Sequence, residues 1–342
     1  MIFRNLLLPF SALFLCAAAE PPPPPAALAP YVMDGRLLPG DYAWIEGSFA
    51  DAPPDKKAEF EAIRSWAEAC MDEAKDEARE ALAAAGFPAA NLDGVATGPL
   101  ACRQAMIYPR HTDLTSYARL REQMALAKPV ADSFLMAVGL AGELGNTGGG
   151  DDFARALGAR VQLDQMLARS LSWGAGSASA TAPELPPVAR EIVLARLNTA
   201  YLAQTERGAE WLKAQVVQSG WPTQSAYGPV AHRQAWLLVQ HADHDPLFQL
   251  EALRLMEPLA ERGEVSKADL ALLHDRVMLK LTGRQRYGTQ VECVAGERRP
   301  QPLEDESALS RWRTEAGLPP EAEYLAMMDG LVGPCPRANQ GR

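Results

Sequence analysis

The sequence contains none of the short motifs that identify the common hydrolase, zinc and redox families. It has no His-Glu-x-x-His, no Gly-x-Ser-x-Gly and no Cys-x-x-Cys. Blocks of lysine or arginine are also missing, and the 43 acidic residues outnumber the 33 basic ones. An acidic chain without a basic patch does not attract nucleic acid or an anionic membrane surface, so we expect neither as a partner.

A hydrophobic run long enough to cross a membrane is lacking at the N-terminus. Arg4 precedes an apolar run from Leu6 to Ala19 that is interrupted by Pro9. Such a run is shorter than the ~20 apolar residues that a bilayer requires. It is typical of a secretory signal peptide, here residues 1–19, with cleavage near Ala19. We therefore expect no transmembrane segment in the mature chain.

The same segment predicts the compartment. Cys16 would permit a lipid anchor, but it follows Leu15, where a lipoprotein signal has a small residue. Cleavage near Ala19 is therefore preferred, and the expected localisation is periplasmic or secreted.

Four cysteines are left after such cleavage: Cys70, Cys102, Cys293 and Cys335. An even number in an oxidising compartment indicates disulfides. Three pairings are possible, and closure of the shorter loops favours Cys70–Cys102 and Cys293–Cys335. Buried free thiols are the alternative.

Proline and small residues divide the remaining chain. A proline run follows the predicted cleavage site, and the segment from Trp173 to Pro187 combines small residues with prolines. We expect a signal peptide (1–19), a proline-rich linker (20–30), an N-terminal helical region (31–175) and a C-terminal helical domain (183–332). No internal repeat is visible.

Hydrophobic periodicity predicts a mainly α protein with a small β-hairpin. The expected helices of the first region are residues 55–85, 114–144 (interrupted at Pro129) and 153–171, with residues 87–108 as a loop. In the second region we expect a long helix over 188–219, broken near Gly208, and then helices over 229–242, from 246, 267–282, 304–312 and 321–328. The hairpin is expected between residues 287 and 299.

Polar residues gather at a corner between two of these helices. Asp245 precedes Pro246 and is expected to cap the following helix. Gln249 lies on the apolar face of that helix, where it could meet His241. Two polar side chains on adjoining apolar faces need partners, because burying them unpaired costs several kcal/mol.

The corner allows three interpretations. In the catalytic one, His241 is a general base or activates a nucleophile and is oriented by Asp243 or Asp275, while Tyr287 and Gln290 bind an oxyanion or the substrate. Histidine suits that role because its pKa lies near neutrality.

A second interpretation is a metal site formed by His241, Asp243, His244 and His274. In the third, these residues are helix caps, core hydrogen-bonding groups and exposed corner residues. No cofactor is indicated by any pattern in the sequence.

Four motifs in the second half resemble a known family. They are GWPTQS (220–225), QHADHDPLFQ (240–249), DRV (275–277) and QRYGTQ (285–290). In this order they are similar to a family of uncharacterised bacterial proteins, domain-of-unknown-function family 6624. The resemblance implies a shared fold and a shared polar cluster, but no established activity. The family carries Asp and Asn where this chain has Thr205 and Gly208, which implies an altered cluster here.

The chemically capable side chains inside these motifs are the candidate site. They are His241, Asp243 and Asp275 as catalytic residues, and Gln240, Gln249, Arg276, Tyr287 and Gln290 as binding residues. If the helices and the hairpin converge, His241, Gln249, Arg276 and Gln290 should lie in one cluster.

Function is left open between a hydrolase-like enzyme, a non-catalytic envelope binding or structural protein, and a metal-binding module. The expected partner is a small molecule or an envelope component. An enzyme predicts that one nitrogen of His241 meets a carboxylate while the other faces solvent.

Overall fold

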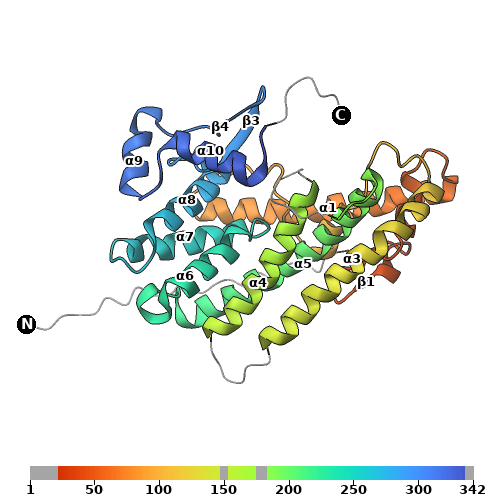
Figure 1. Ribbon diagram of the computed structural model, residues 1–342, viewed down its shortest axis with the longest axis horizontal. Helices are drawn as coiled ribbons and strands as arrows, with labels where there is room; N and C mark the ends of the chain where they lie inside the picture. The colour runs from red at the N-terminus through yellow and green to blue at the C-terminus, as the bar shows by residue number, and fades with distance from the viewer. Residues whose placement is uncertain (1–21, 147–152, 175–182, 336–342) are drawn as a thin grey trace, which may run out of the picture.

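A computed structural model describes residues 22–146, 153–174 and 183–335. In Figure 1 long helices run side by side through the centre, and the hairpin and last helices lie at one end. The expected fold class, mainly α with a small C-terminal hairpin, is confirmed. The predicted signal peptide and Cys16 lie outside the described residues.

The N-terminal segment wraps around the start of the first long helix. It contains a short antiparallel pair, β1 (Val32–Met33) and β2 (Arg36–Leu37), and a 3-10 turn, η2 (Ala43–Ser48). These precede α1 (Pro54–Ala84). Buried apolar residues of the wrap, such as Leu28 and Ile45, form one core with Ile63 of α1 and with residues of later helices.

Residues 87–108 are not entirely a loop, because α2 (Leu100–Ala105) forms within them. All six of its residues are buried, and Cys102 is bonded to Cys70 of α1. A helix of six residues is too short for its apolar period to be detected in the sequence. Such a short helix is not stable in isolation, so the tertiary packing of α2 stabilises it.

Three long helices form the centre: α3 (Tyr117–Asn146), α4 (Phe153–Leu171) and α5 (Pro187–Ser219). The expected interruptions in two of them are wrong. Helix α3 continues through Pro129, which lies on the exposed side, where water can satisfy the carbonyl that loses its N–H partner. Helix α5 continues through Gly208, whose missing side chain admits Leu238 of the next helix.

By length and composition alone, α3 is long and apolar enough to cross a membrane over residues 117–145, and only 22% of its most apolar window is buried. The same helix packs along α4 and α5, and its Asp132 forms an ion pair with Arg196 of α5 at 2.7 Å. These contacts account for α3 as a helix of the bundle. The absence of a transmembrane segment in the mature chain stays a prediction.

The C-terminal part starts with α6 (Gln224–Gln240), α7 (Pro246–Ala260) and α8 (Lys267–Thr282). Helix α6 begins before the expected Pro229 because Thr223 caps a first turn, and the chain then kinks at Gly228. The other two helices begin as expected, since the Asp245 side chain accepts from Phe248 N and the Ser266 side chain from Asp269 N.

The chain ends in the predicted hairpin and two short helices. Strand β3 (Val291–Val294) pairs antiparallel with β4 (Glu297–Pro300), and α9 (Leu309–Glu315) and α10 (Glu321–Val332) follow. The second disulfide, Cys293–Cys335, ties the hairpin to the segment after α10. Both favoured cysteine pairings are thus confirmed.

Helices on the two sides of residues 175–182 pack against each other. Ile192 of α5 belongs to the core of the N-terminal wrap, whereas Leu82 of α1 and Leu157 of α4 belong to the core of the C-terminal helices. The division into regions 31–175 and 183–332 stays a prediction, but the two regions do not have separate cores.

We predict that removing the first disulfide by Cys70→Ser with Cys102→Ser lowers the free energy of unfolding by about 2–4 kcal/mol, because the bond closes a 32-residue loop. Denaturant unfolding of the oxidised proteins measures this. Cys293→Ser with Cys335→Ser opens a loop of 42 residues and is expected to lose a similar amount by the same loop-closure argument. An unchanged midpoint in the first double variant would contradict the prediction.

Candidate functional site

His241 lies at the C-terminal end of α6 and is paired with a buried carboxylate from another helix. Its Nδ1 lies 2.7 Å from Oδ2 of Asp164, which belongs to α4 and is completely buried. The imidazole side chain is 21% exposed, and its Nε2 forms no hydrogen bond with any residue that the structure describes. One nitrogen is therefore held by an acceptor, while the other has no partner among the described residues and belongs to a partly exposed ring.

The exposed edge of this imidazole lines a groove of about 1130 Å³. Phe134, Met166, Trp173 and Leu237 contribute most of its apolar wall, and Leu331 and Val332 at the end of α10 close one side. The Tyr201 ring packs edge-on against His241, with 6.0 Å between ring centroids. Burial raises the pKa of Tyr201, and the Asp164 carboxylate raises it further, so this phenol stays neutral.

Asp243 is the centre of a separate ionic cluster. Its carboxylate accepts from Arg276 Nε at 2.9 Å, from Arg276 Nη2, and from Lys280 Nζ at 2.5 Å. Burial alone would raise the pKa of Asp243, but Arg276 and Lys280 together hold it well below its usual value. Two cations on one carboxylate leave it a poor proton acceptor at neutral pH.

Gln249 connects this cluster to the backbone of α6. Its side chain is fully buried, donates to Val239 O at 2.9 Å and accepts from Lys280 Nζ at 2.7 Å. Its amide also reaches the carbonyl of Gln240 at 3.5 Å. Gln249 points inward as expected, but its partners are these groups and not His241.

Asp275 organises the loop that leads to the hairpin. It is completely buried and accepts hydrogen bonds of 2.9 Å from the backbone N–H groups of Arg286, Tyr287 and Thr289. Gln290 belongs to the same loop, where its backbone N–H donates to the buried Gln285 side chain at 2.8 Å. These bonds fix the backbone between α8 and β3.

The structure thus brings some predicted site residues together and separates others. Arg276 and Gln249 both contact Asp243, whereas His241 contacts Asp164 and the Tyr201 ring. Gln290, and with it Tyr287, lies in the Asp275 loop network.

The acceptor that orients His241 is Asp164, and not Asp243 or Asp275, which the sequence had suggested. Asp164 lies on the same buried stripe of α4 as Leu157, Val161 and Leu167. A lone carboxylate in an apolar helical stripe is the sequence signal that points to this residue.

The residues of the metal interpretation are not gathered around one point. His274 packs edge-on against Tyr287, whereas His244 is near Arg103 on another side of the corner. Among residues 22–146, 153–174 and 183–335, no group of three or more His, Cys, Asp or Glu side chains is placed to hold a metal ion.

Comparison with known proteins agrees with the resemblance seen in the motifs. Residues 189–334 of this mainly helical chain, which include the C-terminal hairpin, match the family model of DUF6624, a family of unknown function. The predicted similarity of the C-terminal half is thus confirmed. No curated protein and no solved structure matches the chain.

Thr205 and Gly208, the positions at which the resemblance implied other residues, lie inside α5. Thr205 is buried and donates its hydroxyl to Leu202 O at 2.9 Å. A Cβ at Gly208 would lie 3.2 Å from the Leu238 side chain, so leucine fills the space beside this glycine. The imidazole–carboxylate pair does not depend on either position.

We predict that stability falls between pH 6.5 and about 4 because of His244. Burial first, and the nearby Arg103 second, lower the pKa of this histidine from 6.5 to about 4. The unfolded chain takes up a proton in this range that the folded chain does not, so folding is fully favoured above pH 6.5 and less so below it. Unfolding free energies of wild type and His244→Gln across this range measure the contribution.

His244→Gln is expected to reduce the loss of stability over this window, while His111→Gln, a change in a partly exposed turn, leaves it as in wild type. Identical pH slopes for wild type and His244→Gln would overturn the prediction.

We also predict that Asp275→Asn destabilises the protein by about 2–4 kcal/mol, because one buried acceptor oxygen becomes an amide donor that faces backbone N–H groups. Denaturant unfolding tests this, with Asp329→Asn on the exposed pair with Arg298 as the control. A loss below that of the control would show that the loop does not need this carboxylate.

Proposed function

We propose that this protein is an extracytoplasmic hydrolase-like enzyme in which His241 is the general base. The observation that carries the proposal is the state of the imidazole: Nδ1 is held by the buried Asp164, Nε2 has no hydrogen-bond partner among the described residues, and the side chain lines a solvent-reachable groove. This is the arrangement that a base needs, since the acceptor fixes the tautomer and the other nitrogen receives the proton.

Asp164 would act in two ways. Its Oδ2 accepts from His241 and also from the Gln165 side chain at 3.0 Å, which holds the carboxylate in place. When the imidazole takes a proton from water, the buried negative charge stabilises the resulting imidazolium. Asp164 is therefore a positioning residue, and His241 is the group that touches the reacting water.

The groove indicates the kind of substrate. Aromatic and aliphatic side chains form most of its wall, and Arg169 adds a positive charge at the exposed rim. An ester or amide with an apolar group beside the bond to be cleaved fits such a lining. Water attacks the carbonyl carbon while His241 takes its proton, and the proton is then passed to the departing oxygen or nitrogen.

The compartment is part of the same proposal. Two disulfides are compatible with an extracytoplasmic protein. The signal-like segment at residues 1–19 supports export to the periplasm or secretion.

The test uses two chromogenic probes, p-nitrophenyl butyrate and bis-p-nitrophenyl phosphate, with purified full-length protein. We expect His241→Gln and Asp164→Asn to lower kcat/KM for the ester about a hundredfold or more, because the base is lost in one and its tautomer in the other. His111→Gln is the matched control for unspecific imidazole catalysis. Circular dichroism shows whether each variant is folded.

Turnover of the ester that is equal in wild type and folded His241→Gln would reject the proposal. So would failure of diethyl pyrocarbonate to modify His241, because the reagent acylates an accessible neutral imidazole nitrogen. Binding of apolar esters without turnover would favour the alternative, a non-catalytic envelope binding protein.

A further inference from the structure

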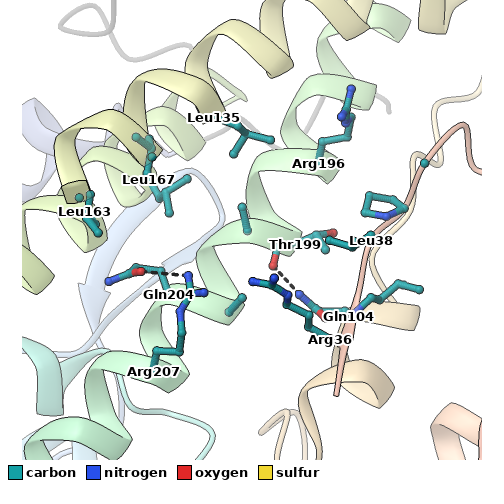
Figure 2. A pocket seen from close by; sticks show the side chains of 18 residues that line it. Arg36, Leu38, Gln104, Leu135, Leu163, Leu167, Arg196, Thr199, Gln204 and Arg207 are labelled. Carbon is teal, nitrogen blue, oxygen red and sulfur yellow. Dashed lines mark hydrogen bonds between the residues drawn. The ribbon is translucent and has the colours of Figure 1, made fainter. Parts of the chain in front are cut away.

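A second cavity lies on the other side of α4 and has a different character. It encloses about 480 Å³ between β2, α3, α4 and α5. Figure 2 shows leucines of α3 and α4 (Leu135, Leu163 and Leu167) on one side and the arginines Arg36 and Arg207 on the other. Volume and apolar lining are within the range of small-molecule sites, about 300–1000 Å³.

Arg36 and Arg207 face this cavity without a neutralising partner. Among the described residues, neither forms an ion pair, and Arg207 donates only to the Gln204 side chain, at 3.2 Å. Arg36 Nε is buried and has no hydrogen-bond partner. Burial lowers the pKa of Arg207, and the positive charge of Arg36 lowers it further, so the two guanidinium groups repel each other.

A third arginine lines the same cavity. Arg196 gives one nitrogen to Asp132 at 2.7 Å, but its Nε and Nη1 are buried and bond to no described residue. Its side chain is only 13% exposed. Unpaired buried donors are costly, and a protein of net charge −10 has carboxylates enough to pair them. Arg36 Nε and two nitrogens of Arg196 are thus buried donors that no described residue satisfies, and the exposed Arg207 adds a further positive charge, so an anion from outside the chain is the partner that fits this cavity.

The arrangement is held by bonds that reach across the sequence. The Gln104 side chain accepts from Leu37 N at 2.6 Å and donates to Thr199 O at 2.7 Å, which joins β2 to α5. Both bonds are buried, and the tight turn at Asp34–Gly35, with positive φ at both residues, returns the chain so that β2 follows β1. Arg36 is thus presented to the cavity by a fixed strand.

We propose that this cavity binds a small amphipathic anion, a carboxylate or phosphate group on an apolar chain. The head group lies between Arg36 and Arg207, and the chain lies against the leucines of α3 and α4. Guanidinium groups bind either head through charge-assisted hydrogen bonds, so the two heads share one recognition chemistry. The cavity is too small for a polymer or a folded partner.

This site is distinct from the groove of His241. Leu163 and Leu167 line the cavity, whereas Gln162, Gln165 and Met166 of the same helix line the groove. Helix α4 separates the two, and the anion site needs no catalysis by His241. Failure of the proposed hydrolysis and failure of anion binding are therefore independent results.

The experiment is isothermal titration calorimetry of the full-length protein with four probes, each below its micelle concentration. Sodium decanoate and decyl phosphate carry head and chain, decan-1-ol carries the chain alone, and inorganic phosphate carries the head alone. We expect decanoate or decyl phosphate to bind about tenfold or more tightly than both partial probes. The tighter of the two identifies the head group.

Variants locate the site. Arg36→Gln and Arg207→Gln should each weaken binding of the tighter probe about tenfold, and Arg262→Gln, an exposed arginine in the turn after α7, should not. Gly139→Leu places a side chain at the cavity mouth, where an added Cβ meets nothing within 4 Å. The change favours the helix, and circular dichroism checks that the variant is folded.

Equal affinity for decan-1-ol and decanoate would overturn the proposal, since it would show apolar adsorption without a head-group site. Affinity unchanged in both folded arginine variants would overturn it as well, and so would absence of binding by both charged probes.

Discussion

The contact between Asp164 and His241 is the constraint on which the central part of the structure depends. A completely buried carboxylate is tolerated only where a donor meets it, and the donor is 77 residues away in the sequence. The pair therefore fixes how α4 and α6 meet, and with them the wall of the groove. The same helix, α4, supplies leucines to the anion cavity on its other side. One helix thus shapes two chemically different surfaces.

Charged groups elsewhere in the molecule serve architecture. Asp243, Arg276, Lys280 and Gln249 fasten the corner between α6 and α7 to α8, and each ionic group has its partner inside the cluster. Asp275 does the same for the loop before the hairpin. Polar groups that use all their hydrogen bonds on one another fix the positions of the helices that carry them. Groups with an unused donor or acceptor are available for a ligand. This contrast separates His241 and Arg36 from the corner residues.

Much of the architecture could be predicted from local patterns. Apolar spacing found the long helices, and Asp245 marked the start of one of them, because a helix cap depends on neighbouring residues alone. The interruption expected at Pro129 was wrong because exposure of that side of α3 lets water replace a backbone bond. The short α2 was missed because tertiary packing maintains it.

The site was less predictable for the same reason. His241 could be identified because histidine and aspartate gather at this corner of the sequence. Its acceptor lies on another helix, far away in the sequence, so no local pattern identifies it. An acidic residue in the buried stripe of α4 indicates that the carboxylate has a partner, but the sequence does not show which residue that partner is. Arg36 lies in an irregular wrap, where its meeting with Arg207 depends on Gln104 joining β2 to α5. Such long-range pairings follow from the folded topology.

Asp164 lies upstream of the segment 189–334 that matches the family. The carboxylate that orients the imidazole is thus supplied by sequence that the shared segment does not include. If the imidazole has the role proposed for it, a protein built from that segment alone would need an acceptor from another source, such as a different upstream helix or a second chain. The flanking region would then set the tautomer of a histidine that it does not contain.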